Sequence, residues 1–155
     1  MLEQLAESWL INNRVNLQLL REIPPEGLTA TLSTRGGRGV GAQLVHLLDV
    51  RRWKLEAADK ALAADLPAPK RDDGEDRDLL IDAFERSGEA IATLIRSCDP
   101  DTGEVKGFKR GIVAFVGYLI AHESHHRGHA MLTLKQAKIR RSDALKMGLW
   151  NWSKI

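Results

Sequence analysis

Four of the five histidines in this chain of 155 residues lie close together, at positions 122, 125, 126 and 129. At 100° per residue, a helix would place all four within about 100° of arc, as one stripe along one face. The spacing therefore predicts a helix through this segment. An apolar run over residues 111–121 comes directly before it, so we expect one long helix over about residues 111–139.

The rest of the chain predicts three further amphipathic helices. Apolar residues recur at helical spacing over 2–21, 40–65 and 76–97, and each stretch is followed by proline or a turn signal. A short helical piece follows over 142–152, with Ser142 or Asp143 as its N-cap. No segment shows the period-two alternation of a strand. We therefore expect an all-α fold: a single four-helix-bundle domain over residues 1–155 with a short C-terminal helical segment.

Composition narrows the classes of function. The 23 basic and 21 acidic residues give a net charge of +2, which provides no strong field for nucleic acid or a membrane surface. The single cysteine, Cys98, excludes an internal disulfide, and the N-terminus lacks the pattern of a signal peptide. We expect a cytoplasmic protein that acts on a small molecule. Spare apolar surface on the bundle helices favours a homodimer.

The histidine stripe is suited to metal binding. Side chains four residues apart on a helix are neighbours, so two imidazoles at that spacing can hold one ion. His122 with His126, and His125 with His129, both meet this condition, and only one pair is needed. His46, on a distant apolar segment, is a candidate third ligand, because metal sites in bundles use side chains from facing helices.

The same segment contains the sequence His-Glu-x-x-His. In zinc peptidases this motif supplies two ligands and a general base, which makes Glu123 a candidate catalytic base. Arg127 is a candidate for holding an anionic substrate. The alternatives are an interhelical carboxylate for Glu123 and a salt bridge within the bundle for Arg127. Gly128 does not stand where the extended peptidase motif requires glycine, which disfavours a peptidase.

Two segments resemble those of a known family. They are His-Leu-Leu-Asp-Val-Arg-Arg-Trp at residues 46–53 and His-Glu-Ser-His-His-Arg-Gly-His at residues 122–129, and they resemble the DinB / YfiT-like superfamily of metal-binding four-helix bundles. The resemblance implies that His46, His122 and His126 hold one divalent ion, zinc or nickel. Members commonly have glutamine where this chain has His129, which implies that His129 is not an obligatory ligand.

The resemblance also implies a range of reactions. The superfamily includes transferases and isomerases that use mycothiol or bacillithiol, so we expect a thiol-dependent S-transferase or isomerase with a low-molecular-weight thiol as co-substrate. A metal-dependent hydrolase of a small molecule and a non-catalytic metal-binding stress-response protein remain alternatives. Three histidines leave at least one metal position open, and we expect polar groups from Arg52, Glu123 or Arg127 around it.

Overall fold

The computed structural model describes residues 1–155 and consists of helices without strands, which confirms the predicted all-α fold. Four helices are long, namely α1 (Leu2–Glu22), α3 (Val40–Ala58), α5 (Arg77–Ser97) and α6 (Gly111–Gln136). The short elements are α2 (Pro25–Thr29), α4 (Lys60–Ala63), η1 (Arg71–Glu75), α7 (Asp143–Gly148) and η2 (Trp152–Lys154). None of the helices combines the length and apolar character needed to cross a bilayer.

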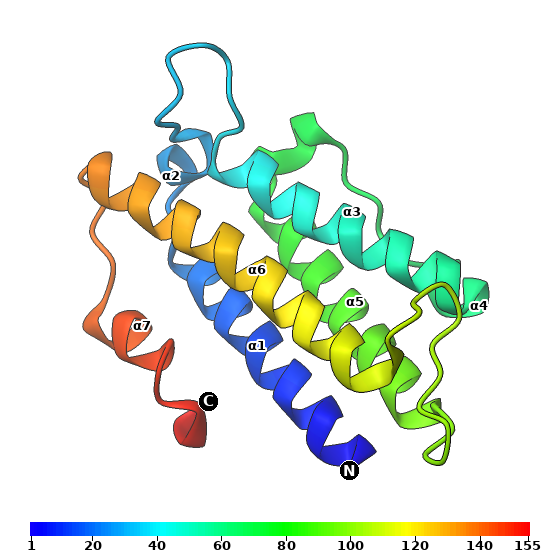
Figure 1. The fold of residues 1–155 in the computed structure, drawn as a ribbon. Helices are drawn as coiled ribbons and strands as arrows, with labels where there is room; N and C mark the ends of the chain where they lie inside the picture. Colours follow the sequence, from blue (N-terminus) through cyan, green and yellow to red (C-terminus); the bar gives the residue numbers. More distant parts are fainter.

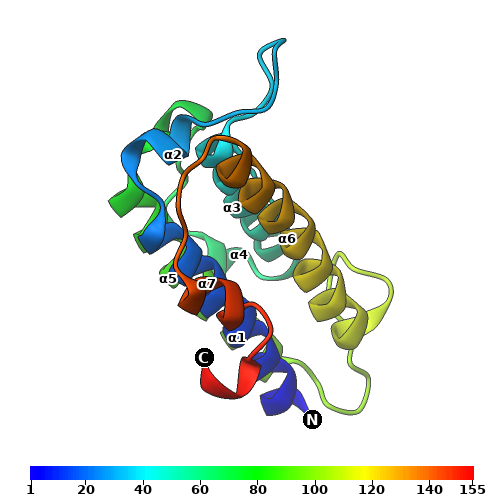
Figure 2. The same ribbon diagram turned by 90° about the vertical axis from the view of Figure 1, so that its left-hand side faces the viewer.

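The four long helices form a bundle of two layers (Figure 1). Figure 2 shows α1 and α5 in one layer and α3 and α6 in the other. The connection after α3 returns along the bundle, so α3 and α5 begin at the same end. Gly41 at the start of α3 lies so close to Gly74, just before α5, that a Cβ on either glycine would collide with the other's backbone. This contact fixes where α3 starts, and α3 carries one of the candidate ligands.

Local signals set several of the helix ends. The side chain of Asp76 accepts a hydrogen bond from the backbone N of Leu79 and caps α5, and Ser142 caps α7 in the same way, as predicted. The predicted second helix over 40–65 is interrupted. Asp59 is extended, with φ −149° and ψ 104°, and its carboxylate accepts from the backbone N of Ala61. This local bond competes with helix continuation, so α3 ends at Ala58.

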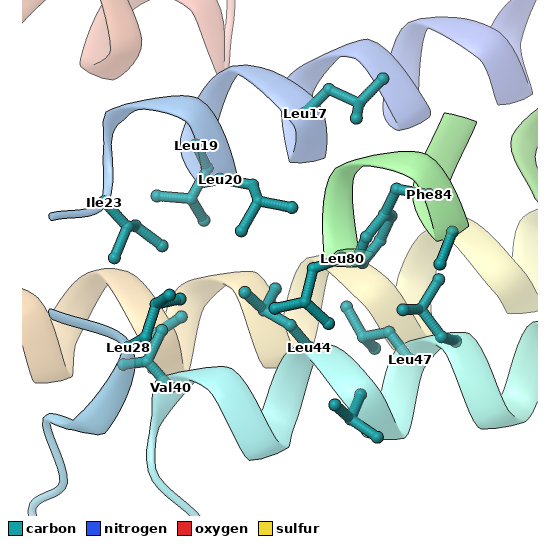
Figure 3. Close-up of a cluster of buried hydrophobic side chains, with 14 of the residues drawn as sticks. Leu17, Leu19, Leu20, Ile23, Leu28, Val40, Leu44, Leu47, Leu80 and Phe84 are labelled. Atoms are coloured by element: carbon teal, nitrogen blue, oxygen red, sulfur yellow. The ribbon is translucent and has the colours of Figure 1, made fainter. Parts of the chain in front are cut away.

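The core of the bundle consists of two apolar clusters with a polar layer between them. Figure 3 shows the first cluster, which includes Leu20 of α1, Ile23 directly after α1, and Leu44 of α3. The second cluster, around Trp9 and Phe115, fills the end of the bundle where α1 begins. The polar layer takes residues from all four long helices, and its members are Asn12, Asn13, Asn16, Arg51, Ser87 and Glu123.

Candidate metal centre

Three histidines from two helices face one another between α3 and α6. His46 lies on α3, and His122 and His126 lie one turn apart on α6. The ring centroid of His46 is 5.4 Å from that of His122 and 5.0 Å from that of His126, and the two α6 rings are 4.8 Å apart. One nitrogen from each ring can be chosen so that all three lie within 4.8 Å of one another. The structure thus brings together the three residues that the resemblance implied as ligands.

The environment keeps these imidazoles neutral. Burial is the largest cause lowering the pKa of His46, His122 and His126, and neighbouring positive charge adds to it; the pKa of His126 falls to about 4. A neutral imidazole is the form that binds metal. The Nδ1 atoms of His122 and His126 are buried and have no hydrogen-bond partner. Three converging neutral imidazoles, two of them with an unsatisfied nitrogen, fit a divalent metal ion.

The other two histidines of the stripe lie outside this cluster. His125 and His129 are exposed, and their ring centroids are 4.2 Å apart. The centroid of His129 is 6.3 Å from that of His126. No third histidine, cysteine or carboxylate joins His125 and His129 in a metal-binding geometry, whereas His46 joins the other pair. The sequence allowed either histidine pair to bind a metal, and the position of α3, which carries His46, favours His122 with His126.

Glu123 points into the polar layer. Its carboxylate is buried and accepts hydrogen bonds from Arg51 at 2.6 Å (Nε to Oε1) and 3.0 Å (Nη2 to Oε2). Two more come from the Nδ2 atoms of Asn12 and Asn16, each 2.7 Å from Oε2. Oε2 accepts three of these hydrogen bonds and Oε1 accepts one, so four donors hold the carboxylate within this layer. The sequence suggested two roles for Glu123, a catalytic base or an interhelical carboxylate, and this geometry corresponds to the second. It directs Glu123 away from the histidine cluster.

Arg51 is the residue of this region that the sequence analysis missed. It is fully buried, and its guanidinium lies 4.7 Å from the ring centroid of Trp9 and 4.5 Å from that of Phe84. Its Nη1 donates to the Oδ1 of Asn13 and to the Oγ of Ser87. The sequence does carry a signal: Arg51 shares a helical face with Leu47 and Leu55, and three asparagines interrupt the apolar face of α1.

Arg52, which the sequence analysis placed near the metal, is only partly buried on the outer side of α3. It pairs with its helical neighbours, at 3.8 Å from Asp49 and 3.4 Å from Glu56. Pairs of this kind at a surface contribute little to stability. Arg52 has no contact with the histidine cluster among its hydrogen bonds and ion pairs.

Arg127 also turns toward the polar layer. Its Nη1 donates to the Oδ1 atoms of Asn12 and Asn16, at 3.0 Å and 2.7 Å, and its Nη2 donates to the Oγ of Ser124 at 3.0 Å. Burial lowers the pKa of its guanidinium from the ordinary value. Each asparagine therefore bridges two charged groups, donating to Glu123 and accepting from Arg127. Arg127 makes no salt bridge, contrary to the alternative considered from the sequence.

The histidine cluster has different surroundings at its two ends. Toward the start of α6, the ring of Tyr118 stacks on His122 with centroids 6.0 Å apart and planes inclined by 16°. Toward the end of α6 lies a cavity of about 320 Å³ beneath the loop before α3. It is lined by Thr31, Leu32, Ser33, Arg38, Gln43, His129, Leu132 and Thr133. None of the three clustered histidines lines it, but Gln43 and His129 stand about one helical turn from His46 and His126 on α3 and α6, so the cavity begins about one turn from the cluster. The charge of Arg38 reaches it and lowers the pKa of His46.

Comparison with known proteins gives one match. The sequence model of the DinB family matches residues 1–138, which include all four long helices and the three clustered histidines. Searches of curated proteins and of solved structures gave no match. The match agrees with the resemblance drawn from residues 46–53 and 122–129, and it covers the fold and the histidine cluster together.

Proposed function

The chain belongs to the DinB family, and we propose that it is a metal-dependent enzyme that transfers a small thiol to an electrophile or uses the thiol to assist an isomerisation. His46, His122 and His126 would hold one divalent ion, zinc or nickel. When bound, the ion would act as a Lewis acid and favour the thiolate form of a thiol at its open position.

The observation that carries this proposal is the number of donors. Three imidazoles converge, and no fourth histidine, cysteine or carboxylate joins them. Structural zinc sites use four protein ligands, whereas catalytic sites use three and leave a position for a reacting molecule. The cavity beneath the loop before α3 gives that molecule a place beside the cluster, and Arg38 supplies a positive charge there for an anionic end.

The position of Glu123 supports thiol chemistry over hydrolysis. In zinc hydrolases with the His-Glu-x-x-His motif, the glutamate acts as general base for the attacking water, whereas a thiol, with an ordinary pKa of about 8.5, is ionised by a bound ion without such a base. Four donors occupy the carboxylate of Glu123, the base that the sequence motif suggests, and they hold it in the polar layer. The chain's own residues would then bind and orient the reactants without taking the proton.

The first test concerns the ligands. Metal content per chain is measured for the purified protein and for the His46→Ala, His122→Ala and His126→Ala variants, with His129→Ala as the matched control on the same helix. We expect about one ion per chain in the wild type and the control, and a large loss in the other three. Full metal in His122→Ala would contradict the assignment and point to His125 with His129.

The second test concerns the reaction. The loaded protein is mixed with 1-chloro-2,4-dinitrobenzene and each of several low-molecular-weight thiols, including mycothiol and bacillithiol, and thioether formation is followed. We expect turnover only with a thiol present, and its loss in His126→Ala. Hydrolysis of test esters without any thiol would favour the hydrolase. A loaded protein that is inactive in both assays would favour non-catalytic metal binding.

A further inference from the structure

A second cavity, separate from the histidines, lies on the opposite side of α6. Its volume is about 500 Å³, and it is lined by Ser124, Arg127, Gly128, Met131, Leu149, Trp150 and Trp152. On a helix, Arg127 and Met131 point about 100–180° away from His122 and His126. Figure 1 shows the C-terminal segment turning back from the end of α6 to lie beside α1, and this segment supplies the far wall of the cavity.

The charge at the floor of this cavity is not balanced. The polar layer and Arg127 together contain two guanidinium groups, those of Arg51 and Arg127, and one carboxylate, that of Glu123. Arg51 takes both oxygens of Glu123, and Arg127 has only amide and hydroxyl oxygens as acceptors. An arginine stays charged in proteins, and burying a charge without a counter-ion is costly. The polar layer and Arg127 together therefore carry one net positive charge, which an anion in the cavity would balance.

The walls of the cavity are apolar. Met131 contributes from α6, and Leu149, Trp150 and Trp152 contribute from the C-terminal segment. Trp150 is 83 % exposed and Trp152 is 39 % exposed, so two indoles stand open to solvent at the mouth. Large exposed apolar groups beside a cavity are typical of ligand sites, and a volume of this size suits a small molecule.

We propose that this cavity binds a small carboxylic acid with an apolar body, with the carboxylate at Arg127 and the body against Met131, Trp150 and Trp152. Arginine suits this ligand because a guanidinium can donate two hydrogen bonds to one carboxylate. The site does not depend on the proposed reaction, since it uses no histidine and lies on the other side of α6.

The probe for the test is octanoate, with octanamide as a neutral molecule of matched shape. Binding to the metal-loaded protein is followed by calorimetry and by tryptophan fluorescence. We expect saturable binding of one octanoate per chain, and about 10- to 100-fold weaker binding of octanamide, because the amide has no negative charge and only one acceptor oxygen for the guanidinium. Equal affinity for the two probes would overturn the proposal.

Two glycines of α6 provide a matched pair of variants. Both Gly128 and Gly117 are exposed and have open space where a Cβ would lie, but only Gly128 lines the cavity. Gly128→Leu fills the cavity, so octanoate should bind at least about tenfold more weakly, while Gly117→Leu should bind it like the wild type. Unchanged binding in Gly128→Leu would place the probe elsewhere, including on the metal, and would overturn the proposal.

The role of Arg127 is tested separately. Arg127→Gln keeps a hydrogen-bond donor and removes the charge, so we expect it to bind octanoate and octanamide with similar affinity. A variant that still prefers octanoate about tenfold would contradict a carboxylate site at this residue. If Arg127→Gln fails to fold, the Gly128→Leu and Gly117→Leu comparison decides the question.

Discussion

The histidine cluster and the polar layer share one turn of α6, yet their polar atoms have opposite surroundings. In the polar layer, four donors from α1 and α3 surround the carboxylate of Glu123. In the histidine cluster, on a neighbouring face of the same helix, the Nδ1 atoms of His122 and His126 have no hydrogen-bond partner in the chain. Buried polar groups are nearly always hydrogen-bonded, so the difference separates a region satisfied by the chain itself from one suited to an external ligand.

The largest effect is expected when one charge of the polar layer is removed. Arg51→Met leaves the carboxylate of Glu123 buried without its main partner, and we expect the free energy of unfolding to fall by about 3–5 kcal/mol. Urea unfolding of the metal-free protein measures this change.

The double variant Arg51→Met with Glu123→Gln serves as the control. It removes both charges of the pair, so it should recover a large part of the lost stability. A single Arg51→Met variant that loses less than about 1 kcal/mol would show that the ion pair is not the main determinant of stability in this layer.

A smaller effect is expected at the histidine cluster, where an ion stabilises the folded chain by binding it. Zinc or nickel at about 100 times its dissociation constant should stabilise the wild type by about 2.7 kcal/mol. His126→Ala should lose this gain and His129→Ala should keep it, as measured by thermal unfolding with and without the ion. Equal losses in both variants would extend the site to the exposed histidines.

The smallest effect is a dependence on pH in the metal-free protein. The pKa of His126 is about 4 in the fold against an ordinary value of 6.5, so between these values the unfolded chain binds more protons than the folded chain. Stability is therefore complete above about pH 6.5 and falls as the pH drops toward 4. Chemical unfolding at several pH values should show this slope, reduced in His126→Ala. A wild-type slope no steeper than that of the variant would contradict burial of the His126 imidazole as its cause.

Helical spacing predicted the bundle well because several of the helices are bounded by residues with local effects. Pro24 and Pro25 follow α1, and Ser142 caps α7, as the sequence indicated. The end of α3 was missed because the capping bond of Asp59 outweighs the apolar pattern that continues past it. The grouping of His46 with His122 and His126 agrees with the family resemblance, whereas spacing alone allowed either histidine pair.

The direction of Glu123 could not be predicted from its motif. The sequence His-Glu-x-x-His gives the order of residues, but the partner of the glutamate is set by what faces that side of the helix. In this chain Arg51 of α3 and two asparagines of α1 face it. These partners are far apart in sequence, and only the packing of three helices brings them together.

The polar layer has a consequence for how the helices are aligned along the bundle axis. A slip of α6 by one turn, about 5.4 Å, would place Leu119 or Arg127 where Glu123 now meets Arg51. Leucines and isoleucines would repack after such a slip at modest cost, but a misplaced charge would not. Because all four long helices contribute to the layer, it permits only one axial register of the bundle. The height at which His46 meets the two histidines of α6 is thereby set by residues that do not belong to the cluster.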